Sequence, residues 1–178
     1  RYSDSRRTRI AAEVSEEFTE EDLIPQEEVL IAITRRSYVK RLPIRAYRQG
    51  RGRRVITTRD EDAVLYLFSA NTLDDVLFFT NRGRVFRQKA HQIPDTRSRG
   101  IPLVNLLPLQ EGERVTAALA VENNGLGKSG LQDSNRYLVM VTRQGRIKRL
   151  ALQEVGAVRS SGLAVIILDE GDELGWVK

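Results

Sequence analysis

Three segments of the chain repeat one short pattern, and this repeat constrains the fold more than any other feature of the sequence. Each is an apolar run that ends in threonine, followed by a tight turn and a basic run. The copies begin at positions 29, 76 and 137 and read VLIAITRRSYVKR, VLFFTNRGRVFR and YLVMVTRQGRIKR. Their apolar runs have the period of strands. Glycine in two of the three turns suits a primed hairpin turn, which needs positive φ. Each segment is therefore predicted to be a β-hairpin.

The repeating unit extends beyond the hairpin to a basic, glycine-bearing segment and a further apolar strand. The glycine-bearing segments are Arg48–Arg54, Arg97–Gly100 and Arg159–Gly162, and the strands expected after them are Val64–Ser69, Val115–Val121 and Leu163–Leu168. Residues 122–136 interrupt the second unit and have the composition of an inserted loop. Units of this size are typical of propeller blades, and a single blade cannot bury both of its faces. The predicted fold class is all-β, a partial propeller-like array of about three blades.

Charge is distributed unevenly along the chain, which has a formal net charge of +5 and a pI near 9.8. Residues 13–28 carry eight acidic side chains and no basic one, whereas residues 29–59 carry ten basic side chains and no acidic one. We interpret residues 1–27 as a short helix and an acidic leader, and residues 28–178 as the β domain. The leader either competes with an anionic partner for the basic face or is a solvated linker.

The basic residues of the hairpins recur at regular intervals, as binding to an extended line of phosphates requires. The alternative, that they only solvate exposed strands, predicts mixed charges rather than the nearly pure positive charge of these hairpins. Contacts to phosphate alone predict affinity without strong base specificity. The candidate DNA-binding residues are Arg35, Arg36, Lys40, Arg41, Arg48, Gln49, Gly50, Arg51, Gly52, Arg53, Arg54, Arg82, Arg84, Arg87, Lys89, Arg97, Arg99, Arg143, Arg146, Lys148 and Arg149.

Catalytic, cofactor and metal motifs are weak in this sequence. The chain has no cysteine, and its one histidine, His91, has no nucleophile pattern around it. Residues 125–130 read GLGKSG but lack the spacing of a phosphate-binding loop. The apolar runs are too short to span a bilayer. We expect no catalytic residue, cofactor or metal site in this chain, and no membrane partner.

Several of these stretches resemble the C-terminal region of the A subunit of bacterial DNA gyrase. Residues 78–85 (FFTNRGRV) and 104–109 (VNLLPL) are similar to blade sequences of that family, and residues 21–25 (EDLIP) to the entry into its first blade. Its basic box has the form QRRGGRG, and Gln49–Arg54 is the counterpart by position. Gln49, Arg51 and Gly52 match this box, but the third glycine is missing and the loop is one residue short.

The resemblance implies a β-pinwheel that wraps double-stranded DNA around its outer edge in support of ATP-dependent negative supercoiling. It also implies a cytoplasmic A2B2 enzyme of A and B subunits. Its catalytic tyrosine, ATP and Mg²⁺ would lie outside this chain. Because the box is altered, the A subunit of topoisomerase IV is the nearest alternative. A propeller that binds proteins is a second, with the acidic leader or residues 122–136 as its docking segment.

Overall fold

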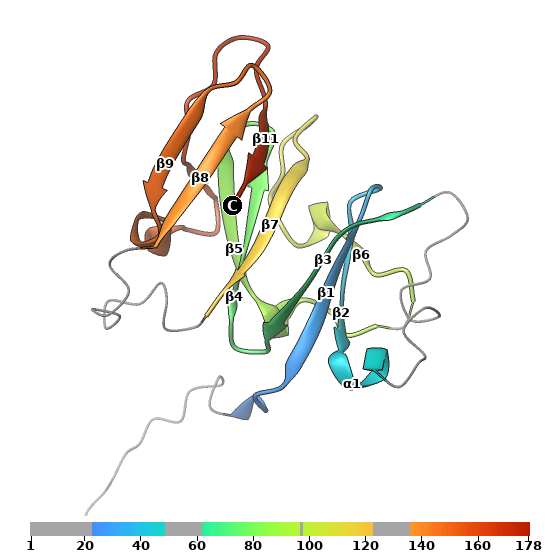
Figure 1. Cartoon of the computed structure of the whole chain (residues 1–178). Helices are drawn as coiled ribbons and strands as arrows, with labels where there is room; N and C mark the ends of the chain where they lie inside the picture. The colour runs from blue at the N-terminus through green and yellow to red at the C-terminus, as the bar shows by residue number, and fades with distance from the viewer. Residues whose placement is uncertain (1–22, 49–61, 97, 123–135) are drawn as a thin grey trace, which may run out of the picture.

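The computed structural model describes residues 23–48, 62–96, 98–122 and 136–178, which form three small β-sheets (Figure 1). The first sheet has the strand order β3-β1-β2-β6, the second β10-β5-β4-β7, and the third β11-β8-β9. Each sheet is one blade, so the all-β prediction with about three blades is confirmed. The strands are β1 (Glu28–Thr34), β2 (Tyr38–Pro43), β3 (Val64–Asn71), β4 (Asp75–Thr80), β5 (Arg84–Lys89), β6 (Ile101–Pro102), β7 (Val115–Val121), β8 (Tyr137–Thr142), β9 (Ile147–Ala151), β10 (Leu163–Ala164) and β11 (Leu174–Val177).

Short helical turns join the strands in the described part of the chain. They are α1 (Ile44–Ala46), η3 (Ala90–Gln92), η4 (Leu103–Asn105) and η5 (Leu152–Ala157). None of these helices is long and apolar enough to cross a membrane. The leader helix predicted within residues 1–22 and the insert at 123–135 lie outside the described residues, so the predicted boundary at residue 28 stays a prediction.

The three predicted hairpins are β1–β2, β4–β5 and β8–β9, and all three are antiparallel pairs. The threonine that ends each first strand is buried, and its hydroxyl accepts a hydrogen bond from the amide four residues on, at 3.2, 3.4 and 3.1 Å. Positive φ is confirmed at Gly83 and Gly145, and Ser37 adopts it too, at 60°. The primed turn is nevertheless wrong, because the two residues before each of these keep negative φ. The residue with positive φ is the last of each turn, whereas a primed turn has positive φ at its first central residue.

The fourth strand of a blade comes from the next repeat, which the sequence did not predict. β6 belongs to the second repeat but pairs with β2 of the first blade, and β10 belongs to the third repeat but pairs with β5 of the second blade. The predicted strand Leu163–Leu168 is therefore wrong. Only Leu163–Ala164 is a strand, and β11 takes the expected place beside β8. Val165 and Ile166 are apolar because they are buried against the neighbouring sheet, not because they extend a strand.

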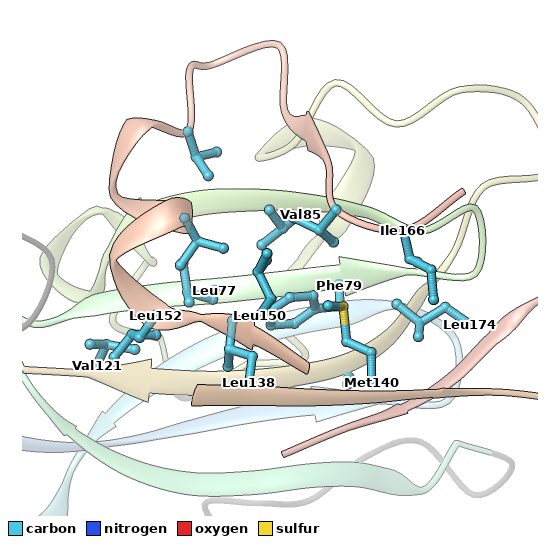
Figure 2. Packing of buried hydrophobic residues seen from close by; sticks show 14 residues of the cluster. Leu77, Phe79, Val85, Val121, Leu138, Met140, Leu150, Leu152, Ile166 and Leu174 are labelled. Carbon is cyan, nitrogen blue, oxygen red and sulfur yellow. The ribbon is translucent and has the colours of Figure 1, made fainter. Parts of the chain in front are cut away.

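The core lies between the sheets, and β4 is buried on both of its faces. Val76 and Phe78 pack against the first blade, and Leu77 and Phe79 alternate with them to pack against the third. Figure 2 shows this second cluster, in which Leu77, Phe79 and Val85 meet Leu138, Met140 and Leu150. Burial on both faces explains why β4 reads as a continuous apolar run rather than an alternating one.

Candidate nucleic-acid interface

The strand order defines an inner and an outer edge for the array. The third strands β3 and β7 contact each other, as do β7 and β11, so these strands line the inner side (Figure 1). The basic strands β2, β5 and β9 lie farther out, and the exchanged strands β6 and β10 lie outermost. The cations of the second strands, together with Arg99 and Arg159 from the loops that lead into β6 and β10, therefore belong to one outer edge, which we call the rim.

The predicted DNA-binding residues divide into four groups by exposure. Exposed side chains are those of Arg35, Arg36, Arg48, Arg82, Arg143, Arg146, Lys148 and Arg149. Arg41, Arg84, Arg87, Lys89 and Arg99 are half-buried. Lys40 is 1 % exposed, so it does not belong to the surface. Gln49, Gly50, Arg51, Gly52, Arg53, Arg54 and Arg97 lie outside the described residues, and with them the whole counterpart of the basic box.

Carboxylates from other segments approach many of these cations. Glu113 lies 2.9 Å from Arg84, Asp169 lies 2.6 Å from Arg146, and Glu173 lies 3.1 Å from Arg143. The nearly pure positive charge of each hairpin in the sequence is thus partly neutralised in space. From the sequence we argued that cations which only solvate exposed strands would be mixed with acids inside each hairpin. The structure corrects this argument, because acids that lie outside the hairpins in the sequence, such as Glu113 and Asp169, approach the hairpin cations in space.

Two rim arginines rest on aromatic rings instead of carboxylates. The Arg99 guanidinium lies 3.6 Å from the centre of the Tyr38 ring, and that of Arg149 lies 4.6 Å from the centre of the Tyr137 ring. Stacking uses the flat face of a guanidinium and leaves its N–H edge able to donate to a phosphate. These two residues are therefore well arranged for anion contact.

Each blade has one buried acid that accepts a hydrogen bond from its hairpin turn, and these acids were not predicted from the sequence. Asp62 accepts a hydrogen bond from the Arg36 amide (3.1 Å), and Asp172 accepts one from the Gln144 amide (3.0 Å). Glu113 accepts one from the Thr80 hydroxyl (2.7 Å). All three acids lie two residues before the third strand of their blade.

On the inner side, Glu173 joins the second and third blades. Its carboxylate accepts hydrogen bonds from Asn81 (3.1 Å) and Arg114 (2.5 Å) and forms an ion pair with Arg143 (3.1 Å). The Asn81 hydrogen bond, helped by the two arginines, lowers the pKa of Glu173 below its usual range. Arg114 and Arg143 also line a cleft of about 630 Å³ between the inner strands. These arginines are thus engaged within the protein and lie away from the rim.

The part of the chain that the structure describes contains no cluster of His, Asp or Glu that could hold a metal ion. His91 is half-buried and packs against the 72–74 turn, where its amide donates to the Thr72 carbonyl oxygen (2.8 Å).

Three blades, two of which take their fourth strand from the next repeat, together with a basic rim define the class of propeller-like modules that present a curved, cationic edge. The chain belongs to the family described as DNA gyrase C-terminal domain, β-propeller, whose model matches residues 28–71, 74–122 and 136–175. It is 42% identical over 98% of its length to the DNA gyrase A subunit of Dehalogenimonas lykanthroporepellens, and 38% identical over 98% to that of Staphylococcus epidermidis. The chain spans about a fifth of the length of these relatives, 21% and 19% respectively. The family resemblance is therefore confirmed.

Solved structures give the same fold. The C-terminal domain of DNA topoisomerase IV matches 87% of this chain and 46% of its own with a TM-score of 0.69 and 29% identity. The DNA gyrase A C-terminal domain matches 85% of this chain and 46% of its own with a TM-score of 0.60. At 19% identity the second match is informative for the fold alone.

Proposed function

We propose that this chain binds double-stranded DNA along its rim and bends it, as the wrapping region of a DNA gyrase A subunit. The observation that carries the proposal is that cations on β2, β5 and β9 of three successive blades lie along one outer edge of a family member. Each phosphate contact releases condensed counterions, so the rim supplies affinity that depends on salt rather than on base sequence.

In the parent enzyme the wrapped duplex would be presented as a crossover for strand passage, with negative supercoiling driven by ATP in the B subunit. This chain would supply the path of the DNA, and the catalytic tyrosine, ATP and Mg²⁺ would act elsewhere in a cytoplasmic A2B2 assembly. The glycine-bearing loops of the second and third repeats lead into the exchanged strands β6 and β10.

The test measures DNA affinity by fluorescence anisotropy over a series of salt concentrations, with a duplex and its shuffled sequence. Lys148→Ala and Arg149→Ala each remove a rim cation, and Arg114→Ala removes an inner one as a matched control. We expect each rim variant that loses a phosphate contact to reduce the slope of log K against log salt by about 0.9. The inner variant should keep the wild-type slope. Equal effects at rim and inner positions would contradict the proposed surface, and strong preference for one short sequence would contradict recognition through phosphates.

A second candidate, the A subunit of topoisomerase IV, has a specific observation in its favour. The C-terminal domain of DNA topoisomerase IV matches this chain with a TM-score of 0.69 and 29% identity, and the altered basic box is in keeping with weaker wrapping. A topology assay on the parent enzyme separates the two candidates. Negative supercoiling of relaxed plasmid supports gyrase, and decatenation without supercoiling supports topoisomerase IV.

A further inference from the structure

The loop that crosses from the second repeat to the first blade is tied down along β2. The Arg41 amide donates to the Pro94 carbonyl oxygen (3.0 Å), and the Leu103 amide donates to the Ser37 carbonyl oxygen (2.8 Å). Between these two ties, β6 pairs with β2. We call residues 94–96 and 98–102 the crossing loop. Its two ends are held by backbone hydrogen bonds, and Ser98 and Arg99, the described residues of its middle part, are held by side chains.

Two side chains of β2 hold that middle part. The ammonium of Lys40 donates to the Ser98 carbonyl oxygen at 3.0 Å, and the Tyr38 ring lies under the Arg99 guanidinium at 3.6 Å. Tyr38 and Lys40 are two residues apart in a strand, so they share one face of it, and they contact consecutive residues of the loop. Gly100 completes the fit, since a Cβ there would collide with the Val39 carbonyl oxygen.

Lys40 cannot itself reach a phosphate from this position. Its side chain is among the largest that are fully buried, at 1 % exposure, and burial lowers its pKa. A buried ammonium is costly unless it is hydrogen-bonded, and the Ser98 carbonyl oxygen supplies such a partner. Its charge therefore serves a contact inside the protein, although the sequence placed it among the phosphate contacts.

The second blade has a comparable tie built from different residues. Arg84 stands at the position that Tyr38 holds in the first blade, and its guanidinium donates to the Ser161 carbonyl oxygen at 2.5 Å. Gly162 follows with φ of 81° and lies against the Phe86 ring. In both blades, therefore, the side chain at this position of the second strand holds the loop at the residue just before its glycine.

We propose that Tyr38 and Lys40 are positioning residues, which hold Arg99 in the orientation that meets a DNA phosphate at the junction of the first two blades. This inference rests on the proposed function and assigns roles within it. A guanidinium already held by a ring loses less freedom when it binds. Arg99 is the contact, and the two β2 side chains act through it.

The test is a double-mutant cycle read by the salt dependence of DNA binding. Arg99→Ala is expected to reduce the slope of log K against log salt by about 0.9, the loss of one phosphate contact. Lys40→Met, which keeps the length of the side chain, is expected to shift the slope in the same direction. In the Arg99→Ala background Lys40→Met should have no further effect, because the residue it positions is already gone.

Several outcomes would overturn the inference, and they differ from a failure of the proposed function. A further loss of about 0.9 in the double variant would make Lys40 a direct contact. An unchanged slope in folded Lys40→Met would make it a packing residue only. Absence of DNA binding by the wild-type chain would refute the proposed function itself. If Lys40→Met does not fold, Tyr38→Phe and Tyr38→Leu give an independent reading. The ring-retaining variant should keep the wild-type slope and Tyr38→Leu should lower it, and equal slopes would overturn the role of the ring.

Discussion

Alanine at three glycines with positive φ should destabilise the protein to very different extents, because their surroundings differ. Gly145 has φ of 88° and nothing within 4 Å of an added Cβ. A left-handed conformation costs a non-glycine residue about 1–2 kcal/mol, and the stiffer unfolded chain offsets about 0.4–1 kcal/mol of this. We therefore expect Gly145→Ala to cost about 1 kcal/mol or less.

At Gly100 an alanine would cost the free energy of a left-handed conformation and, in addition, that of a steric clash. Its φ is 98°, and an added Cβ would collide with the Val39 carbonyl oxygen, which is a backbone atom that cannot rotate away. β6 would have to move off β2 and weaken their two residue pairs. Overpacking of this kind costs about 1–3 kcal/mol, so Gly100→Ala should cost about 3 kcal/mol in all. Gly162→Ala should fall between the two, because its Cβ would meet the Phe86 ring at 2.7 Å and a ring can shift.

Urea denaturation followed by circular dichroism measures this ordering directly. The unfolding midpoint should fall least for Gly145→Ala, more for Gly162→Ala and most for Gly100→Ala. If Gly145→Ala destabilises as much as Gly100→Ala, positive φ alone explains the glycines. The argument that β6 and β2 approach too closely for a side chain would then be refuted.

Three further predictions concern charge. Glu173 has a lowered pKa in the folded protein, so its stabilising contribution should be present above its usual pKa of about 4.3 and be lost as the pH falls through the folded value. Between pH 7 and pH 3 the melting temperature of Glu173→Gln should therefore fall less than that of the wild type. An equal fall would contradict the role of the Asn81 and Arg114 contacts. Deleting residues 1–27 should raise DNA affinity at low salt if the acidic leader competes for the rim, whereas unchanged affinity would indicate a solvated linker. Alanine at the four arginines of the glycine-bearing segment Arg48–Arg54, which are Arg48, Arg51, Arg53 and Arg54, should abolish negative supercoiling by the parent enzyme while relaxation or decatenation persists. Normal supercoiling by this variant would exclude the segment as the wrapping element.

The repeat in the sequence was enough to predict the hairpins and the propeller class, because each apolar run ends at a buried threonine that recurs in every copy. It could not predict the exchange of strands. β6 and β10 are two residues long, too short to show a period, and their partners lie in another repeat. The run after Ala164 is apolar because of packing between sheets, which a single sequence does not distinguish from a strand.

The candidate site was predicted by residue type, but its geometry was not. Lys40 and Arg41 are adjacent in the sequence, yet Lys40 is buried and Arg41 is half-exposed, since neighbours in a strand point to opposite faces. The carboxylates that neutralise several rim cations come from distant segments, as Glu113 does for Arg84. The acid two residues before the third strand could have been found from the sequence in the first two repeats. In the third repeat it could not, because Leu163–Leu168 was predicted as that strand in place of β11.

The claim that the rim bends DNA is tested most directly by energy transfer between dyes at the two ends of a short duplex. A duplex of roughly 40 bp is much shorter than the persistence length of about 150 bp, so it is nearly straight in solution. On saturation with this chain at low salt we expect transfer efficiency to rise, equally for shuffled sequences, and to return to the free value as salt is added. A duplex that is bound, as shown by anisotropy, but whose transfer efficiency stays that of free DNA would contradict the account.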